Sequence, residues 1–251
     1  MSVRPVTIKL GGIAGRHAES VAWLASSAPS STVVVHGGGN EVAEWSRRLG
    51  IEPREHDGLR VTDAATLEVA IAVLGGLVNT RLVAALVAAG RPAVGLSGAD
   101  GHLLRLRRRD PQFGEVGEVI GADPALPEVL IGAGSLPVIA SLGVDADGDL
   151  LNVNADEAAG AIAAARGGLL LLCTDVSGVQ HEGTIVDRLH AAAAERMLAD
   201  GSASAGMRPK LRAALVAARA GCEVRIVDGR SASVIEGALH GDAAGTMITA
   251  A

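Results

Sequence analysis

Aromatic side chains are almost absent from this sequence of 251 residues, which has one Phe, two Trp and no Tyr. Proteins that bind single-stranded nucleic acid need aromatic side chains on which the bases can stack. The formal net charge of −6 also disfavours attraction to a phosphate backbone. The composition therefore argues against nucleic acid as a partner of this chain.

Cysteine is equally scarce, with Cys173 and Cys222 as its two representatives. Two cysteines are too few for a disulfide framework, and their spacing does not match a metal site. No continuous apolar run reaches the roughly 18 residues of a membrane span, and no basic segment leads into a signal core. We expect a soluble cytoplasmic protein with buried thiols, no membrane contact and no metal held by its own side chains.

Lysine is the third scarcity. Of the 22 basic residues, two are lysine, Lys9 and Lys210, and all the others are arginine. A chain that uses arginine for its solvated positive charges keeps lysine where a compact ammonium fits and a planar guanidinium does not. Both positions are therefore candidate functional sites, with chance survival of the two lysines as the alternative.

Apolar runs rich in Val, Leu and Ile alternate with helical patterns along the whole chain. Continuous apolar runs suit parallel strands that are buried on both faces. The order predicts an α/β protein, a three-layer αβα sandwich around an open, mainly parallel central sheet. The expected strands are Val6–Leu10, Thr32–His36, Pro92–Leu96, Leu136–Ser141, Leu169–Thr174 and Glu223–Val227, and the expected helices include Glu19–Ala28, Asn40–Leu49, Ala64–Ala89, Asp187–Asp200 and Pro209–Ala220.

Glycine follows most of the expected strands, as in Gly11-Gly12 after the first and Gly37-Gly38-Gly39 after the second. Ligands of open α/β sheets bind outside the carboxyl ends of the strands. Glycine there lets the backbone approach a ligand and point N–H groups at an anion. The sequence therefore predicts a phosphate-binding edge of the sheet.

The stretch Leu151–Gly160 carries two amides and a carboxylate where a strand gives way to a helix. Asn154 is the expected N-cap of that helix, and Asp156 falls in its first turn, where the helix dipole favours a carboxylate. A purely structural role for Asp156 and a functional one both fit this position.

Two polar segments interrupt the alternation of strands and helices. The residues from His102 to Glu118 have short alternating runs and four arginines, and we expect an exposed hairpin or meander there. The segment from Arg54 to Asp63 is polar and turn-rich, and we expect it to form a lid over the glycine-lined edge.

Ten short motifs spread over the whole chain resemble those of the amino acid kinase family, and within it the branch that acts on N-acetyl-L-glutamate. Single motifs are weak, but all of them in this order are highly specific. They are I-K-L-G-G at Ile8–Gly12, V-H-G-G-G at Val35–Gly39, G-L-R-V-T-D at Gly58–Asp63, G-L-S-G-A-D-G at Gly95–Gly101, V-G-E-V at Val116–Val119, N-V-N-A-D-E-A-A-G at Asn152–Gly160, T-D-V-S-G-V at Thr174–Val179, G-M-R-P-K at Gly206–Lys210, D-G-R at Asp228–Arg230 and G-T-M-I at Gly245–Ile248.

The resemblance implies that ATP phosphorylates the side-chain carboxylate of N-acetyl-L-glutamate to an acyl phosphate, an early step of arginine biosynthesis. In-line phosphoryl transfer asks the protein mainly for positioning and positive charge. Lys9 matches the family lysine that stabilises the transferring phosphoryl group, and Lys210 matches the one on the ADP side. Asp156 matches the carboxylate that holds both ammonium groups.

The resemblance also assigns binding residues. For the substrate it implies two glycine N–H groups, an arginine and two amides, namely Gly38, Gly39, Arg60, Asn152 and Asn154. For the nucleotide it implies the glycine turn after the first strand, the turn after Thr174 and a loop over the phosphates, namely Gly11, Gly12, Asp175, Val176, Ser177, Gly178, Val179, Ser202, Ser204 and Gly206.

ATP and Mg²⁺ are the implied cofactors, with Mg²⁺ held largely by phosphate oxygens and water. The family organisation implies a single domain with a substrate lobe, about residues 1–168, and a nucleotide lobe, about residues 169–251. Hexameric members that arginine inhibits carry an extra N-terminal helix, whereas this chain enters its first strand at Val6. The resemblance therefore implies a plain homodimer that pairs through the helix in Ala64–Ala89.

Several alternatives stay open. Departures from the family pattern at Ile13, Thr80, Arg81, Ala99 and Ala205 leave the acyl group undecided, so N-succinylglutamate or a carrier-protein-bound aminoadipate or glutamate is the second choice. A non-catalytic nucleotide or amino-acid sensor of the same fold would also bind these ligands. A dinucleotide-dependent oxidoreductase would need G-x-G-x-x-G after the first strand, which Gly11–Gly15 does not supply.

Overall fold

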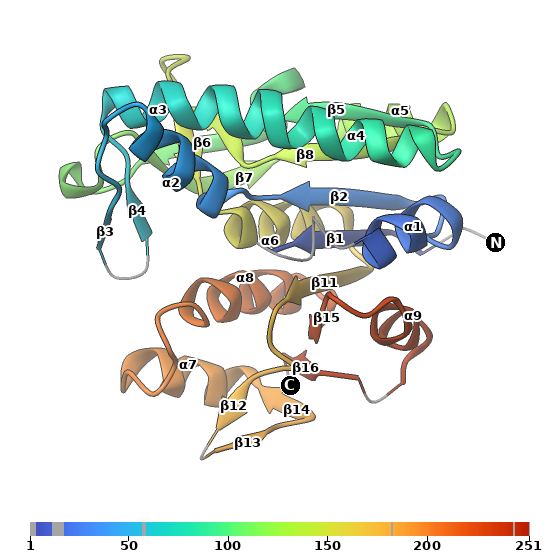
Figure 1. Cartoon of the computed structure of the whole chain (residues 1–251). Coiled ribbons are helices and arrows are strands. Elements are labelled where there is room, and N and C mark those ends of the chain that lie inside the picture. The colour runs from blue at the N-terminus through green and yellow to red at the C-terminus, as the bar shows by residue number, and fades with distance from the viewer. Residues whose placement is uncertain (1–3, 12–17, 57–58, 182, 243, 251) are drawn as a thin grey trace.

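An eight-stranded sheet runs through the computed structural model of the chain, which describes residues 4–11, 18–56, 59–181, 183–242 and 244–250 (Figure 1). The strand order is β14-β16-β15-β11-β1-β2-β8-β5. Neighbours from β5 to β15 are parallel, whereas β16 runs antiparallel to β15. The strands are β1 (Val6–Leu10), β2 (Thr32–His36), β5 (Ala93–Ser97), β8 (Leu136–Ala140), β11 (Leu169–Thr174), β14 (Arg188–His190), β15 (Glu223–Asp228) and β16 (Thr246–Thr249).

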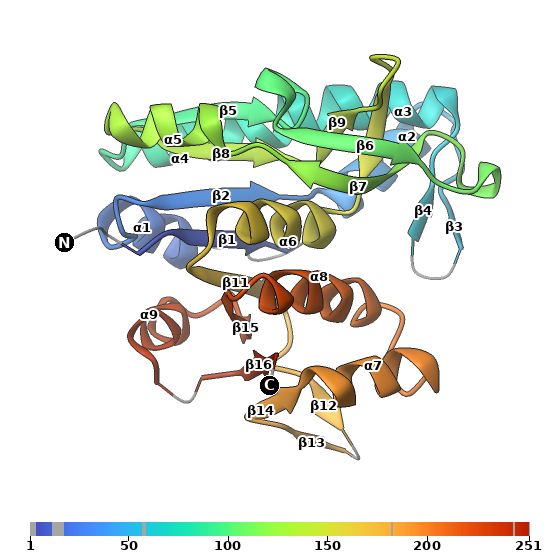
Figure 2. The ribbon, with the colours of Figure 1, turned by 180° about the vertical axis from the view of Figure 1, so that it is seen from behind.

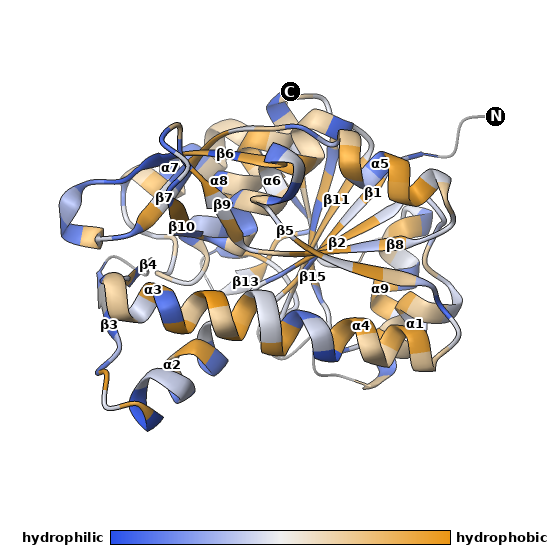
Figure 3. Cartoon of the chain, turned by 90° about the horizontal axis from the view of Figure 1, so that it is seen from above, coloured by the Kyte–Doolittle hydropathy of each residue, from blue (hydrophilic) through white to orange (hydrophobic). Residues whose placement is uncertain are grey.

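Both faces of the sheet are covered by helices, because successive side chains of a strand point to opposite faces. In β2, Val33 and Val35 pack in the core under α6 and α8, whereas Val34 packs in the core under α1 and α4. Figure 3 shows the strands fanned out between the two helical layers. The helices are α1 (Ala18–Ser26), α2 (Gly39–Arg48), α3 (Ala64–Ala70), α4 (Asn79–Ala88) and α9 (Ala232–His240) on one side, and α5 (Ala125–Gly132), α6 (Ala155–Arg166), α7 (Ala191–Ala199) and α8 (Arg208–Arg219) on the other. The predicted αβα sandwich is confirmed.

Smaller strands surround the sheet. β6 (Leu104–Arg108), β7 (Val116–Ala122), β9 (Leu142–Val144) and β10 (Leu150–Val153) close into a small barrel. The predicted hairpin after His102 is confirmed as β6 and β7, but Leu104 and Leu106 are buried in the main core, so the segment is not wholly exposed as expected. β3 (Arg54–His56) pairs with β4 (Leu59–Val61), and β12 (Gln180–His181) pairs with β13 (Thr184–Ile185).

The helix from Ala64 to Ala88 is 25 residues long and contains an 18-residue window with a mean hydropathy of 1.9, so by length and composition it could cross a membrane. Counting continuous apolar residues did not predict a helix of this length, because Glu68 and Arg81 interrupt the apolar run. The helix continues through both residues. α3 and α4 are joined here by a π-helical segment, Ile71–Val78, which contains the Gly75-Gly76 pair. Leu82 and Leu86 of α4 lie in the core against the sheet, which is also how a core helix of a soluble protein behaves.

The residues before position 168 form one half of the sheet, and the residues after it form the other half. Residues before it supply β1, β2, β5 and β8, and residues after it supply β11, β14, β15 and β16 (Figures 1 and 2). Parallel pairing of β1 with β11 joins the halves into one sheet. The division into a substrate lobe and a nucleotide lobe stays a prediction, and this strand order is compatible with it.

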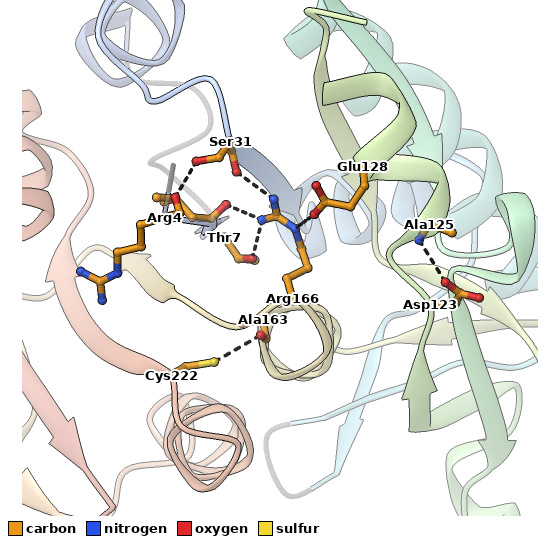
Figure 4. A network of polar contacts seen from close by, with 10 residues as sticks. Arg4, Thr7, Ser31, Asp123, Ala125, Glu128, Ala163, Arg166 and Cys222 are labelled. Atoms are coloured by element: carbon orange, nitrogen blue, oxygen red, sulfur yellow. Dashed lines mark hydrogen bonds and ion pairs between the residues drawn. The ribbon is translucent and has the colours of Figure 1, made fainter. Parts of the chain in front are cut away.

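A buried arginine holds the far end of α6 against the sheet. Arg166, whose side chain is 0% exposed, donates to Val6 O at 2.7 Å and to Ser31 O at 2.8 Å, and pairs with Glu128 at 2.7 Å (Figure 4). Arg166 thereby ties α6 to β1, β2 and α5. Asp156 lies in the first turn of α6 and Lys9 lies near the end of β1, so this contact fixes the two elements that carry the site described next.

Candidate active site

Asp156 lies between the two lysines of the chain. Its Oδ1 is 2.8 Å from Lys9 Nζ, and its Oδ2 is 3.4 Å from Lys210 Nζ. Lys9 comes from β1, Asp156 from the first turn of α6 and Lys210 from the first turn of α8. All three side chains are at most 14% exposed. The structure therefore brings together the three residues that were predicted to be catalytic.

Burial and charge act against each other in this triad. Burial alone would raise the pKa of Asp156, but the charges and hydrogen bonds of Lys9 and Lys210 outweigh it and hold the pKa below its usual value. Burial lowers the pKa of Lys210, while Asp156 acts in the opposite direction. One carboxylate between two ammonium groups leaves a net positive charge, which suits a site for anionic oxygens.

A cavity of about 230 Å³ opens beside Lys9 and Asp156. Polar groups line one part of it and apolar side chains the rest, so an amphiphilic ligand of small size would fit its chemistry. The lining residues are Lys9, Gly37, Gly38, Gly39, Val42, Arg60, Leu74, Val116, Ser141, Asn152, Val153, Asn154, Ala155 and Asp156. The cavity contains all five residues predicted to bind the substrate.

The arginine and the two amides in this cavity are held by local hydrogen bonds. Arg60 of β4 donates to Gly39 O at 2.8 Å, and the Nδ2 of Asn152 donates to Thr62 Oγ1 at 3.1 Å. The Oδ1 of Asn154 accepts from the N–H of Asp156 at 2.9 Å, which confirms the predicted N-cap. The β3–β4 hairpin that carries Arg60 thus lies against the glycine turn, as expected for the lid segment.

The glycine turn Gly37–Gly39 connects β2 to α2. The first intrahelical donor of α2 is the N–H of Val42, which bonds Gly38 O at 2.9 Å, so the N–H groups before it have no acceptor within the helix. A Cβ on Gly38 would lie 2.8 Å from a methyl of Leu74 and 3.2 Å from a methyl of Val78, so a side chain there would require these residues to shift. The turn can therefore present backbone donors to an anion in the cavity.

The first glycine turn is described only in part, since Gly12 lies outside the described residues. The N–H of Gly11 donates to Cys173 O at 3.0 Å, so it continues the β1–β11 ladder and is not free for a γ-phosphate. This corrects the predicted donor role of Gly11. A Cβ there would lie 2.8 Å from Cys173 O and 3.1 Å from Lys9 Nζ, so the position instead provides space for the lysine.

A second cavity, of about 420 Å³, lies between the turn after β11 and the α7–α8 loop. Five of the ten residues predicted to bind the nucleotide line it, and its full lining is Val176, Ser177, Gly178, Gln180, Ile185, Met197, Ser202, Ala203, Ser204 and Met207. Met207 precedes Lys210 by one helical turn. Phosphates that extend from this cavity toward Lys210 would meet its ammonium group.

Three predicted nucleotide residues behave differently. The side chain of Val179 is fully buried in the core, and its N–H is taken by Thr246 Oγ1 at 2.8 Å, so it cannot line the cavity and the prediction is corrected. Gly206 accepts from Lys210 Nζ at 3.2 Å through its carbonyl. Asp175 lies close enough to act on the charge of Lys210. Neither residue lines the cavity: Gly206 bonds to Lys210, and the charge of Asp175 acts to raise the pKa of that lysine.

The largest of these cavities, of about 640 Å³, lies between α1, α2 and α4, and its lining does not include Lys9, Asp156 or Lys210. We assign the chemistry to the two smaller cavities because Lys9 and Asp156 line one and the loop before Lys210 lines the other. Within the described ranges no cluster of three or more His, Cys, Asp or Glu side chains could hold a metal ion.

Sequence reasoning missed the apolar wall of the substrate cavity and one buried ion pair. Val42 and Leu74 face the cavity from two helices, but in the sequence they look like ordinary core positions of an amphipathic helix. Arg109 pairs with Glu157 at 2.5 Å, and burial raises the pKa of Glu157 despite that charge. Arg109 belongs to an arginine-rich run that reads as a solvated face, so only its distance from Glu157 in the folded chain reveals the pair.

Comparisons with known proteins agree with this geometry. The sequence matches the amino acid kinase family over residues 8–228. An acetylglutamate kinase of Rubrobacter xylanophilus is 44% identical over 98% of this chain and 97% of that protein. An acetylglutamate kinase of Methanopyrus kandleri is 42% identical over 93% of this chain and 96% of that protein.

Solved structures give the same answer for the fold. A crystal structure of a Streptococcus mutans protein superposes with a TM-score of 0.84 at 27% identity, covering 98% of both chains. An isopentenyl phosphate kinase structure, at 23% identity, superposes with a TM-score of 0.67 and supports the fold alone. The ordered motifs, the two lysines around Asp156 and these matches lead to one conclusion: the chain belongs to the amino acid kinase family.

Proposed function

We propose that the chain phosphorylates the side-chain carboxylate of N-acetyl-L-glutamate with ATP, an early step of arginine biosynthesis. The observation that carries the proposal is the Lys9–Asp156–Lys210 triad between a small polar cavity and a second cavity on the nucleotide side. The curated relatives over nearly the whole chain are acetylglutamate kinases. A phosphoryl group that passes from one cavity to the other would pass the two lysines.

In the proposed reaction an oxygen of the substrate carboxylate attacks the γ-phosphorus of ATP. The bond between that phosphorus and the bridging oxygen breaks, and its electron pair stays on ADP. Lys9 would stabilise the equatorial oxygens of the transferring group, and Lys210 would stabilise the charge that develops on ADP. Asp156 would keep both ammonium groups in place. No proton transfer is needed, which fits a triad of groups that are already charged.

The substrate cavity provides partners for each part of an acylated glutamate. Arg60 would bind the α-carboxylate with its planar fork, and Asn152 would bind the amide of the acyl group. The N–H groups of Gly38 and Gly39 would bind the carboxylate that receives the phosphoryl group. Val42, Leu74 and Val116 would enclose the apolar parts. Mg²⁺ bound to the phosphate oxygens would neutralise part of their charge.

We further propose a cytoplasmic homodimer that pairs through the helix Ala64–Ala88. In the most apolar window of this helix 39% of the residues are buried in the single chain, and Val87 is 54% exposed. Apolar helix surface of this kind is typical of an obligate interface. Multi-angle light scattering should give twice the chain mass of 25.2 kDa. A monomer or a hexamer would contradict the dimer.

The test of the activity traps acyl phosphate as its hydroxamate. Purified protein with ATP and Mg²⁺ is offered N-acetyl-L-glutamate, N-succinyl-L-glutamate, L-glutamate and L-aspartate. Turnover of N-acetylglutamate in preference to the others is expected. Turnover of N-succinylglutamate alone would keep the reaction and change the substrate. Absence of turnover with every free substrate would reject the proposal, and an ATP-binding titration would then separate a carrier-dependent kinase from a sensor.

A further inference from the structure

One polar side chain lies deep in the apolar helix Ala64–Ala88. Asn79 is 4% exposed, and its Nδ2 is 3.0 Å from His36 Nε2, 2.9 Å from Val138 O and 3.3 Å from Leu96 O. These partners belong to three neighbouring strands: His36 ends β2, Val138 lies in the middle of β8, and Leu96 lies one residue before the end of β5. Two of them are main-chain carbonyls, which can only accept hydrogen bonds. The atom that faces them must therefore be the amide nitrogen, and the amide orientation is fixed.

The orientation of Asn79 determines the protonation of His36. Asn79 Nδ2 has two hydrogens and no acceptor capacity, so it donates to its two nearest partners, Val138 O at 2.9 Å and His36 Nε2 at 3.0 Å, with Leu96 O farther away at 3.3 Å. Nε2 of His36 is therefore the acceptor and carries no proton. The other ring nitrogen, Nδ1, is 2.9 Å from Gly37 O, which can only accept. His36 is thus the neutral tautomer with its proton on Nδ1. Burial lowers the pKa of His36, although the bond to Gly37 and the charge of Glu41 act in the opposite direction.

The Nδ1–H bond determines where the glycine turn points. The peptide between Gly37 and Gly38 is planar and trans, so the Gly37 C=O and the Gly38 N–H point in opposite directions. Holding the carbonyl of Gly37 toward His36, on the side of the largest cavity, turns the N–H of Gly38 toward the other side. Gly37 lines both the largest cavity and the substrate cavity, whereas Gly38 lines the substrate cavity.

The surroundings keep this arrangement rigid. A Cβ on Gly95 would lie 1.9 Å from Asn79 Oδ1, so only glycine leaves room for the amide. His36 itself is 2% exposed. Glycine turns are intrinsically flexible, and a donor aimed at an anion contributes most when it is already in place. The pair of His36 and Asn79 supplies that rigidity from below the turn.

We propose that His36 and Asn79 are positioning residues, which aim the Gly38 N–H at the acceptor carboxylate of the acylated glutamate by holding the Gly37 carbonyl. The inference rests on the proposed function for the identity of the ligand. The geometry that it requires, a neutral His36 with its proton on Nδ1, can be measured without any substrate.

Two variants separate the two hydrogen bonds of His36. His36→Asn keeps a nitrogen donor at the position of Nδ1, next to Gly37 O, and loses the acceptor for Asn79. His36→Gln keeps an acceptor at the position of Nε2 and loses the donor to Gly37 O. Each removes one buried hydrogen bond, so both should lower the free energy of unfolding similarly. His240→Asn and His240→Gln, at a side chain that is 70% exposed, are the matched controls.

The kinetic result expected is a raised KM for N-acetylglutamate in His36→Gln, by about tenfold or more, the usual effect of one misplaced donor. In His36→Asn it should stay within about threefold, and the KM for ATP should stay within about twofold in both, since the nucleotide cavity is elsewhere. Equal losses in both variants, unchanged KM in both, or the reverse order would overturn the proposal.

The spectroscopic result is independent of activity. A two-bond ¹H–¹⁵N spectrum of the wild-type protein, assigned by the signals that vanish in His36→Asn, should show the Nδ1–H tautomer from about pH 6 to 8. The Nε2–H tautomer or an imidazolium would overturn the inference. If this signature is present while no acylated glutamate is phosphorylated, the proposed function fails and the fixed glycine turn stands, with its ligand to be found by titration of small carboxylates.

Discussion

Asp156 pairs with both lysines of the chain. It lies 4% exposed between two ammonium groups, one from strand β1 and one from helix α8. Buried charges are stable only when they are paired. A single carboxylate that satisfies both lysines therefore explains why two cations can remain close together at the place where phosphate charge would arrive.

Replacing Asp156 by Asn should remove this compensation while keeping the shape. We expect the free energy of unfolding to fall by about 3 to 5 kcal/mol and kcat to fall by about 10² or more, because the lysines lose their fixed positions. Urea unfolding and the hydroxamate assay would measure the two effects. Asp147→Asn, at an exposed position, is the control. Unchanged stability together with unchanged kcat would contradict the role given to Asp156.

Cys173 illustrates a residue that is close to the site without a chemical role. It is fully buried beside Lys9, and burial raises the pKa of its thiol to about 12. A thiol with so high a pKa is protonated at neutral pH and is a poor nucleophile. Its carbonyl, which accepts from Gly11, is the part of the residue that the site uses.

At the scale of elements, α6 links Asp156 to the end of the sheet where β1 and β2 begin. Its first turn is capped by Asn154, and its last residue, Arg166, is clamped between β1, β2 and α5. A close contact with α8 runs along its length, where a Cβ on Gly160 would lie 2.8 Å from Ala213 O. The helix is thus held at both ends and along one side, which fixes Asp156 relative to Lys9 and Lys210.

Arg166→Met should test the clamp. Methionine fills similar space but leaves the carbonyls of Val6 and Ser31 and the carboxylate of Glu128 without their donor. We expect a loss of about 3 to 5 kcal/mol in the free energy of unfolding, measured by urea denaturation. Arg219→Met, at a side chain that is 63% exposed, should change it by less than about 0.5 kcal/mol. Equal effects in the two variants would show that the buried arginine is no clamp.

The sequence predicted the six expected sheet strands because each is a short apolar run with helices on either side, and all six were confirmed with boundaries that differ by at most a residue or two. β14 and β16 were missed, since each has three or four residues of mixed polarity. The N-cap at Asn154 was predictable from local chemistry. The tautomer of His36 was not, because Asn79 is 43 residues away along the chain.

The candidate site was predictable for a different reason. The two lysines stood out in a chain otherwise rich in arginine, and the motifs gave them roles before any distance was known. What could not be predicted was the use of each backbone group, such as the N–H of Gly11 and that of Val179, which the fold employs internally. Whether a backbone N–H can bind a ligand depends on whether the fold already uses it in a hydrogen bond. This depends on strand register, which composition does not reveal.

At the scale of the whole molecule, the triad links the stability of the fold to pH. The pKa of Asp156 is lowered in the folded state, so the unfolded chain binds the proton more tightly. Its contribution is fully present above the unfolded value of about 3.9 and is lost as the pH falls through the lower, folded pKa. Glu157, with its raised pKa, acts in the opposite sense.

The difference in free energy of unfolding between wild type and Asp156→Asn isolates the first effect. We expect this difference to be constant from about pH 7 to 5 and to shrink as the pH falls below about 4. Urea unfolding at a series of pH values would measure it. A difference that grew toward acid pH would mean that the carboxyl is protonated in the folded protein, contrary to its place between two lysines.

The sheet also explains how residues 9, 156 and 210 meet. β1 lies at the middle of the strand order and β11 next to it, so the carboxyl end of β1 faces α6 on one side and the start of α8 beyond it. Each half of the chain supplies one lysine, and the carboxylate comes from the helix where the halves join. A small relative movement of the halves would therefore change the Asp156–Lys210 ion pair, whereas Lys9 and Asp156 belong to the same half and would stay paired.

The most direct test of the central claim is acyl-phosphate formation from N-acetyl-L-glutamate by wild type, Lys9→Arg and Lys210→Arg, with Arg107→Lys at a 69% exposed side chain as control. We expect turnover by the wild type and the control. We expect losses of about 10² or more in kcat for both lysine variants, because a guanidinium cannot occupy the space of the ammonium beside Asp156. Full activity of both variants, or no turnover by the wild type, would contradict the proposed role of the two lysines in acyl-phosphate formation.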